Sequence, residues 1–167
     1  MSELQTVSMT IGILTACISV VIGVVNQILS RRRTEKTEQL SLETRQAELF
    51  MQLYDRFNDK DFAKQYTEIL FQHKWTDFDD WMQKYGPMTN LDVFSSWMSV
   101  AVFFEGIGVL IKRKLIDISL VDDLLSSAII MVWEKIEPIA KEYRVRFNRP
   151  QLWEWFEYLY TELKRNE

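Results

Sequence analysis

The first thirty residues contain the feature that most constrains this chain, an apolar stretch without charge. No charged residue occurs between Leu4 and Ser30. Residues 9–29 would form a helix of about 31 Å, which matches the hydrocarbon core of a bilayer. A cleaved signal peptide would begin with a base and have a shorter apolar run. This chain begins MSELQT, and its apolar run ends in polar residues and a triple arginine. We therefore expect residues 1–30 to be a retained transmembrane anchor.

The arginines after this segment predict its orientation. Arg31, Arg32 and Arg33 follow the apolar run directly, and basic residues next to a span stay on the cytosolic side. We expect a single-pass protein of the cell membrane with its N-terminus outside. Residues 31–46 would form a basic and then polar stalk, and residues 47–167 a cytosolic domain.

Small and polar residues of the span recur at spacings of three and four, so they share one helical face. Such a face allows close backbone approach and hydrogen bonds between helices. A chance alignment is the alternative, because these residue types are common in spans. We expect a helix-packing face whose partner is a second copy or another protein. Its residues are Gly12, Thr15, Ala16, Ser19, Gly23 and Asn26.

A second apolar stretch, Val93–Ile111, is also long enough to span a membrane. Glu105 lies within it, and a central carboxylate is costly in lipid. A span that entered from the cytosol at Val93 would also place the basic residues 112–114 outside, against the charge rule. We therefore interpret this stretch as the core helix of a soluble domain.

Helical periodicity continues through the rest of the chain, and strand signals are nearly absent. No Gly or Pro occurs between Val24 and Tyr85, so the anchor helix can continue through the stalk. The expected fold is all-α, with the anchor leading into a bundle of five to six helices. Thr76, Asn90 and Ser119 (with Asp122) are the expected caps, and Pro138 is expected to bend or end its helix. The expected segments run to about residue 57, then over Asp61–Trp75, Thr76–Gly86, Leu91–Leu115, Leu120–Ile136 with a continuation to about Phe147, and from Pro150 onward.

Charge and cysteine content exclude several classes of protein. The net charge is −4; residues 31–36 carry four bases and one acid, and Glu3 is the only other charge before residue 37. Residues 37–167 therefore carry a net charge of −6. This charge is unfavourable for nucleic-acid binding, because neutralising phosphates requires clustered Lys and Arg. Cys17 is the only cysteine, so no disulfide can form within one chain.

Residue patterns that could support catalysis have simpler explanations here. His73 is the only histidine and has no partner nearby in sequence. Asp77, Asp79 and Asp80 lack the spacing, glycine and distal glutamate of a calcium loop, and acids in a first helical turn explain them. The pair Gly106 and Gly108 has no strand before it, so close helix packing is a better interpretation than a dinucleotide site. We expect no catalytic residues, no metal and no cofactor.

Glu105 is the polar residue that stands out, because it lies in the most apolar part of the domain. If buried, it needs a charge or a hydrogen-bond partner. Arg144 and Arg146 are candidate partners by residue type. Glu105 could contact a ligand, but a structural ion pair or a solvent-exposed edge position is the favoured interpretation.

Four segments together are similar to an uncharacterised family of small prokaryotic membrane proteins, a domain of unknown function. They are the anchor followed by Arg31-Arg32-Arg33, FFEGIGVLIKRKLID at Phe103–Asp117, WEKIEP at Trp133–Pro138, and PQLW at Pro150–Trp153. The resemblance implies the same anchored helical architecture and a prokaryotic source. It implies no activity.

These features predict a non-enzymatic scaffold or an accessory subunit of a larger membrane assembly. The expected partners are the lipid bilayer and other transmembrane helices, with no nucleic acid. The alternative is a membrane-tethered sensor or ligand-binding domain with a pocket near Glu105. A hydrolase that uses carboxylates alone is a third class, which a cavity lined by converging acids would favour.

Overall fold

The computed structural model describes the backbone of residues 3–166 and the side chains of residues 20 and 22–165. Over those residues the fold is all-α, as expected, and contains no strand. The chain divides into two compact units, Met1–Arg45 and Gln46–Glu167. We call them the N-terminal unit and the helical domain. In chain order the elements are α1 (Glu3–Phe57), α2 (Lys60–Thr67), the π-helix η1 (Glu68–Gln72), α3 (Phe78–Tyr85), α4 (Leu91–Lys112), α5 (Ile118–Arg146) and α6 (Glu154–Asn166).

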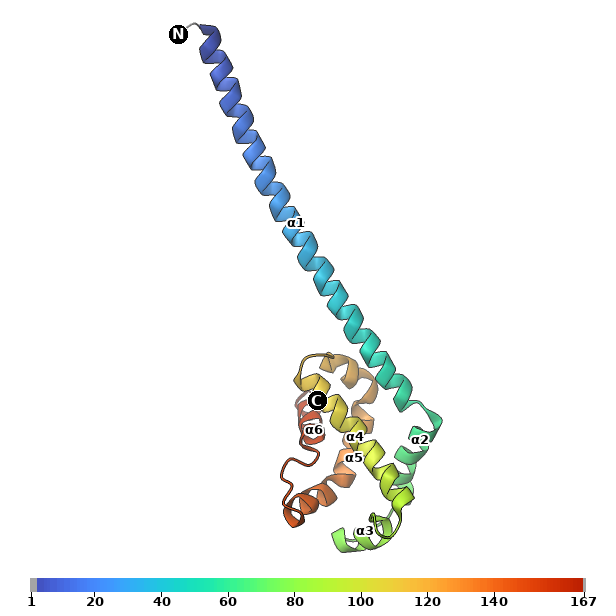
Figure 1. Ribbon diagram of the computed structural model, residues 1–167. Helices are drawn as coiled ribbons and strands as arrows, with labels where there is room; N and C mark the ends of the chain where they lie inside the picture. The colour runs from blue at the N-terminus through green and yellow to red at the C-terminus, as the bar shows by residue number, and fades with distance from the viewer. Residues whose placement is uncertain (1–2, 167) are drawn as a thin grey trace. The chain divides into compact units, whose positions relative to one another are not determined.

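Helix α1 continues without a break from the apolar segment into the polar stalk, as the absence of Gly and Pro predicted (Figure 1). Every side chain described between residues 20 and 45 is exposed, so the N-terminal unit contributes no core of its own there. At Gly12, Thr15, Ala16 and Ser19 of the expected packing face only the backbone is described.

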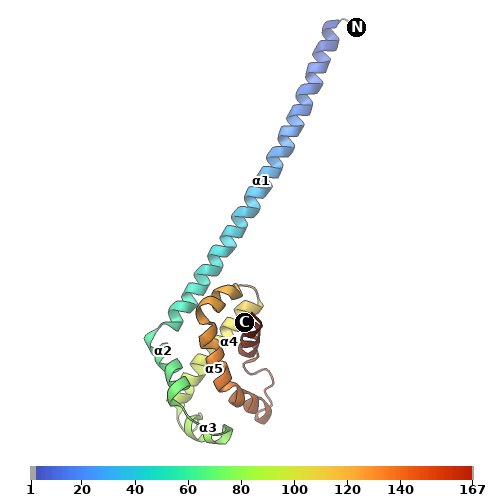
Figure 2. The same ribbon diagram turned by 180° about the vertical axis from the view of Figure 1, so that it is seen from behind.

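The core of the helical domain forms around α4. This helix packs most extensively against α6, and it also contacts α2 and α3, while α5 packs against α6, α3 and η1. Figures 1 and 2 show α4, α5 and α6 side by side from opposite directions. Aromatic side chains dominate the centre: Trp81, Trp97, Trp133, Phe104 and Phe156 are at most 2% exposed. The last turns of α1 join this core through Phe50.

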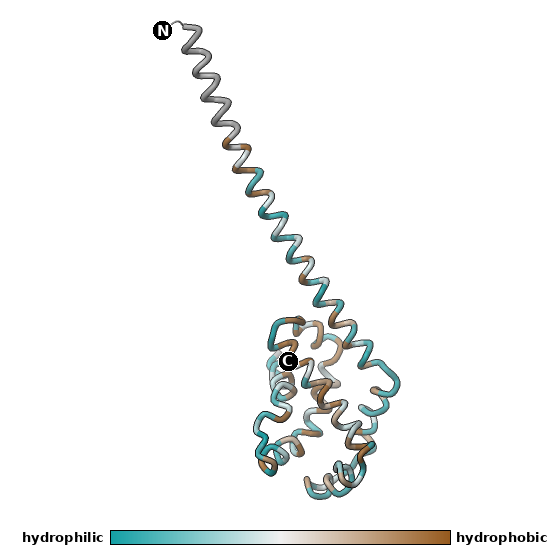
Figure 3. The backbone as a smooth tube through the Cα atoms, viewed as in Figure 1, coloured by the Kyte–Doolittle hydropathy of each residue, from teal (hydrophilic) through white to brown (hydrophobic). Residues whose placement is uncertain are grey.

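Among the described residues, α4 is the helix long and apolar enough to cross a membrane. Figure 3 shows this apolar character along α4. Seven of its residues are buried in the domain, namely Trp97, Val100, Ala101, Phe104, Ile107, Gly108 and Ile111. Its apolar face therefore packs within the helical domain, which agrees with its interpretation as a core helix.

Short polar side chains begin each of the middle helices, although not always the ones expected. Asn90 caps α4 by accepting from the Val93 N–H at 3.3 Å, as predicted. Thr76 was the wrong cap for α3, because the Asp77 carboxylate accepts from the Asp80 N–H at 2.9 Å. Aspartate is at least as good a cap as threonine, and the helix begins one residue later than expected.

The capping box predicted at Ser119 is also wrong. Asp117 caps α5, because its Oδ1 accepts both from the Ser119 N–H at 2.8 Å and from the Ser119 hydroxyl at 2.7 Å. Pro138 does not end α5, which runs to Arg146. Ile136, Ile139 and Ala140 are buried on both sides of the proline, and this burial offsets the roughly 3 kcal/mol that an interior proline costs.

The segment expected as one helix over Asp61–Trp75 ends earlier, at Gln72, and consists of an α-helix followed by a π-helix. Asp59 caps α2, accepting from the N–H groups of Asp61 and Phe62 at 3.1 Å. The α-helical pattern then widens into η1, whose end is marked by the His73 N–H donating to the Glu68 carbonyl at 3.0 Å. A π-helical turn contains one extra residue per turn and is rare outside functional or strained positions.

Gly108 and Gly106 have different roles, although both were expected to allow close packing. A Cβ built at Gly108 would overlap the carbonyl oxygen of Trp155 and lie 2.6 Å from its carbonyl carbon, whereas one at Gly106 meets nothing within 4 Å. Only Gly108 therefore lets the beginning of α6 approach α4.

We predict that Gly108→Ala destabilises the helical domain by about 1–3 kcal/mol, because α6 must move away from α4. Gly106→Ala is the matched control, and it should stabilise the domain by up to about 1 kcal/mol through helix propensity. All six tryptophans lie between residues 75 and 155, so thermal unfolding followed by near-ultraviolet circular dichroism reports on this domain. Equal stability of the two variants would contradict the packing argument.

Candidate functional site

Glu105 lies where α4 meets the first turn of α6. One of its carboxylate oxygens accepts from the Phe156 N–H at 2.7 Å. The first N–H groups of a helix have no partner within the helix, and an acid there also favours the helix dipole. Glu105 therefore caps α6 from a neighbouring helix. Gly108, one turn further along α4, makes the required approach possible.

The arginines proposed as partners of Glu105 make other ion pairs. Arg144 donates to the Glu157 carboxylate and, at 2.8 Å, to the Leu152 carbonyl. Arg146 binds Asp79 through two nitrogens and Glu142 through a third. Prediction by residue type failed because the partner of Glu105 is a backbone group, which leaves no trace in the residue pattern.

Burial raises the pKa of the Glu105 carboxyl above its usual value. The N–H groups of Phe156 and Trp155, and the more distant charge of Arg144, oppose that rise. A carboxylate that is partly buried and already holds a helix terminus has a structural role. This geometry favours the structural interpretation of Glu105 over ligand contact.

His73 lies in a cluster of aromatic rings just after η1. The Trp97 indole N–H donates to its Nδ1 at 3.0 Å, and the Tyr85 ring stacks on it with centroids 4.6 Å apart. Because Nδ1 accepts a hydrogen bond, the ring is neutral here. Burial lowers the pKa of His73, which also favours the neutral form. The histidine thus satisfies the indole N–H of a buried tryptophan.

Lys135 is a partly buried charged residue that the sequence patterns did not single out. Its Nζ donates to the carbonyls of Leu70 and His73 at 2.7 and 3.0 Å, and it lies 4.8 Å from the centre of the Trp75 ring. The ammonium therefore binds the carbonyl end of η1, where a cation is favoured. Burial lowers the pKa of Lys135. The signal in the sequence was a lysine between Trp133 and Ile136, both on the buried face of α5.

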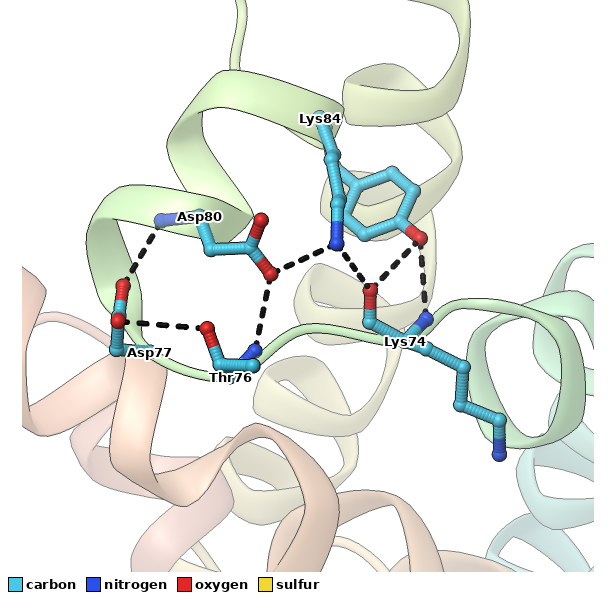
Figure 4. A network of polar contacts seen from close by, with 6 residues as sticks. Lys74, Thr76, Asp77, Asp80 and Lys84 are labelled. Carbon is cyan, nitrogen blue, oxygen red and sulfur yellow. Dashed lines mark hydrogen bonds and ion pairs between the residues drawn. The ribbon is translucent and has the colours of Figure 1, made fainter.

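The acidic cluster after Trp75 organises a turn (Figure 4). Asp77 caps α3, and the Asp80 carboxylate accepts from the Thr76 N–H at 3.0 Å and from Lys84 Nζ at 2.8 Å. Lys84 also donates to the Lys74 carbonyl at 3.3 Å. Asp79 turns instead to Arg146. First-turn acids thus explain the cluster, and no group of metal-ligating side chains gathers within the described residues.

An open cavity of about 300 Å³ lies beside the turn between α4 and α5. Its polar lining includes Lys114, Asp117 and Glu162, and Tyr158 forms part of its wall. Asp117 is already the cap of α5. The cavity therefore offers a shallow mixed surface rather than a set of converging acids.

The N-terminal unit holds the remaining predicted residues. Gly23 and Asn26 of the expected packing face are exposed, with nothing within 4 Å of a Cβ built at Gly23. Arg31, Arg32 and Arg33 are also exposed. The other four residues of the packing face are described only by their backbone.

Comparison with known protein families finds a family whose model matches the chain. A family model described as a domain of unknown function, DUF4760, matches residues 7–163. The chain belongs to the DUF4760 family. No curated protein and no solved structure matches it. The DUF4760 match runs from the apolar segment to the last turns of α6, so it includes most of both units.

Within this DUF4760 domain, we predict that Glu105→Ala costs about 1–3 kcal/mol, because the Phe156 N–H is left without a partner. Glu105→Gln keeps an acceptor oxygen and should cost less. Burial raises the pKa of Glu105 in the folded protein above its pKa in the unfolded chain. The free energy of unfolding therefore falls as the pH rises from the unfolded-state pKa through the folded-state pKa. The stability of the natural protein relative to Glu105→Gln should therefore fall as the pH rises above the usual pKa of a glutamate, about 4.3. Urea unfolding at several pH values measures this, and a pH-independent difference would contradict it.

Proposed function

We propose that this DUF4760 protein is a single-span membrane protein of prokaryotic origin. Its helical domain would serve as a non-enzymatic scaffold or as an accessory subunit of a larger membrane assembly. The observation that supports this most is the exposed apolar surface of α1.

The apolar surface of α1 occupies a continuous arc. With 100° per residue, the apolar side chains sweep about 200° around the helix axis. They are 46–65% exposed: Val20, Ile22, Val24, Val25, Ile28 and Leu29. Burying one such side chain is worth about 1.5–3 kcal/mol, so a helix of this kind is stable only when something apolar surrounds it. Lipid supplies that environment over the length of the segment.

The opposite arc of the same helix suits another helix. Gly23, Asn26, Gln27 and Ser30 fill the remaining directions in the described end of the segment. The same face continues into the stalk as Thr34, Thr37, Ser41 and Thr44. The hydroxyls of the three threonines donate to carbonyls one turn back, at 2.8–3.1 Å, which leaves their methyl groups on the surface. A face of small side chains permits close packing of helices.

The polar groups of the helical domain support a non-enzymatic role. Glu105 caps α6, Lys135 holds the end of η1, and Arg146 binds Asp79. Each has a structural partner that it would lose if it acted on a substrate. Trp81, Trp97 and Trp133 are packed in an aromatic core and are at most 2% exposed. This arrangement suits a rigid body that presents a surface to other proteins.

We further propose that the N-terminus lies outside and the helical domain in the cytosol. Arg31, Arg32 and Arg33 support this orientation because basic residues beside a span stay inside. A reporter that works only in the cytosol should therefore be active when it is fused after Glu167, and one that works only outside the cell should be inactive there. Replacing the three arginines by glutamate should weaken or invert the orientation, and an external reporter on the natural sequence would refute it.

The partner is predicted to pack against the small-residue face. Gly23→Ile places a branched side chain where a partner backbone would lie, so co-purifying proteins or self-association should be lost. Val25→Ile, on the apolar arc, is the matched control and should retain them. Purification in mild detergent with mass spectrometry detects a foreign partner, and an in-membrane association assay detects a second copy. If Gly23→Ile leaves both unchanged, the face has no partner.

A further inference from the structure

Four basic residues form a collar around α1 directly after its apolar segment. Arg31, Arg32, Arg33 and Lys36 are all exposed. At 100° per residue they point in four different directions that span about 200° of the helix. The six residues 31–36 rise about 7.5 Å along the axis, close to the thickness of one headgroup layer. The collar thus has the depth and the spread of a surface facing lipid headgroups.

The collar makes no internal pairs. None of its four side chains has a hydrogen bond or an ion pair within the described part of the chain, and Glu35, the only acid among them, forms no pair with Arg31. Basic residues elsewhere on helix surfaces do pair with acids one turn away, as Lys84 does with Asp80 and Lys141 with Glu137. The guanidinium donors of the collar are therefore all available to an external anion.

The chemistry of the collar selects phosphate. A guanidinium offers parallel N–H groups that bind two oxygens of a phosphate at once. A zwitterionic lipid carries a compensating ammonium beside its phosphate, whereas an anionic phospholipid keeps its net negative charge. The rest of the chain after residue 36 has a net charge of −6, so the collar differs in sign from the remainder of the protein.

We infer that Arg31, Arg32, Arg33 and Lys36 bind the phosphate groups of anionic phospholipids and hold such lipids around the helix. This inference rests on the proposed membrane anchor, and it adds the lipid class that the anchor recognises. It does not depend on orientation, because a symmetric bilayer presents the same headgroups to the collar from either side.

The test uses the full-length chain in nanodiscs that contain equal amounts of phosphatidylglycerol and phosphatidylcholine. Lipids retained on the protein are identified by native mass spectrometry. Each basic residue near the surface favours the anionic lipid by about fivefold at low salt, so phosphatidylglycerol should be retained at least fivefold over phosphatidylcholine. The preference should shrink as salt is added.

Two variants separate the collar from general charge. Replacing all four residues by glutamine should abolish the preference. Arg45→Gln is the matched control: it removes an arginine of the same helix about 18 Å beyond Arg33, and it should leave the preference intact. A natural chain that enters the nanodisc and retains both lipids equally refutes the collar alone, as does a glutamine variant with unchanged preference. A chain that never enters the bilayer refutes the anchor, and the collar with it.

Discussion

The junction between α4 and α6 is the contact on which the helical domain depends. A long, apolar helix can be covered only if a second helix approaches it closely, and the glycine at residue 108 provides the space. The carboxylate of Glu105 then binds the free N–H groups at the start of the arriving helix. Close approach and capping thus act at one place. The buried rings of Phe104 and Phe156, 5.0 Å apart, fill the interior beside it.

This junction has an unusual backbone just before it. Trp153 adopts a left-handed conformation with φ of 54°, although it is neither glycine nor asparagine. Such a conformation costs about 1–2 kcal/mol in a residue with a Cβ. Trp153 is 5% exposed, and burial of so large a side chain offsets the cost. The turn before α6 is therefore held by the core rather than by its own sequence.

Sequence patterns predicted the helical fold well, because apolar spacing and caps such as Asn90 act locally. They failed where a contact joins distant backbone. The partner of Glu105 is an N–H group rather than an arginine, and the partners of Lys135 are two carbonyls, which carry no residue identity. Asp77 and Asp117 displaced the expected caps because several adjacent residues could accept the same N–H groups. Gly106 and Gly108 look alike in sequence, and only the position of Trp155 distinguishes them.

The proposed role follows from where polar groups have partners and where they do not. In the helical domain, the charged side chains near the core hold helix ends and turns. In the N-terminal unit, the described side chains are exposed. An apolar arc and a small-residue face lie on opposite sides of α1, and basic residues follow them. The charged groups of the helical domain thus hold its own helices, and the proposed partners of α1 would use surfaces that are exposed in the described chain.

The π-helix η1 contains one residue more per turn than an α-helix. Its widened turn accommodates one residue more than an α-helix of the same rise would hold, and Lys135 closes its end by binding the carbonyls of Leu70 and His73. If the same residues between Thr67 and His73 were wound as an ordinary α-helix, the side chain that follows them would point about 100° away. The Trp97 indole would then lose its acceptor. The wider winding of this turn therefore decides which residue meets the buried tryptophan.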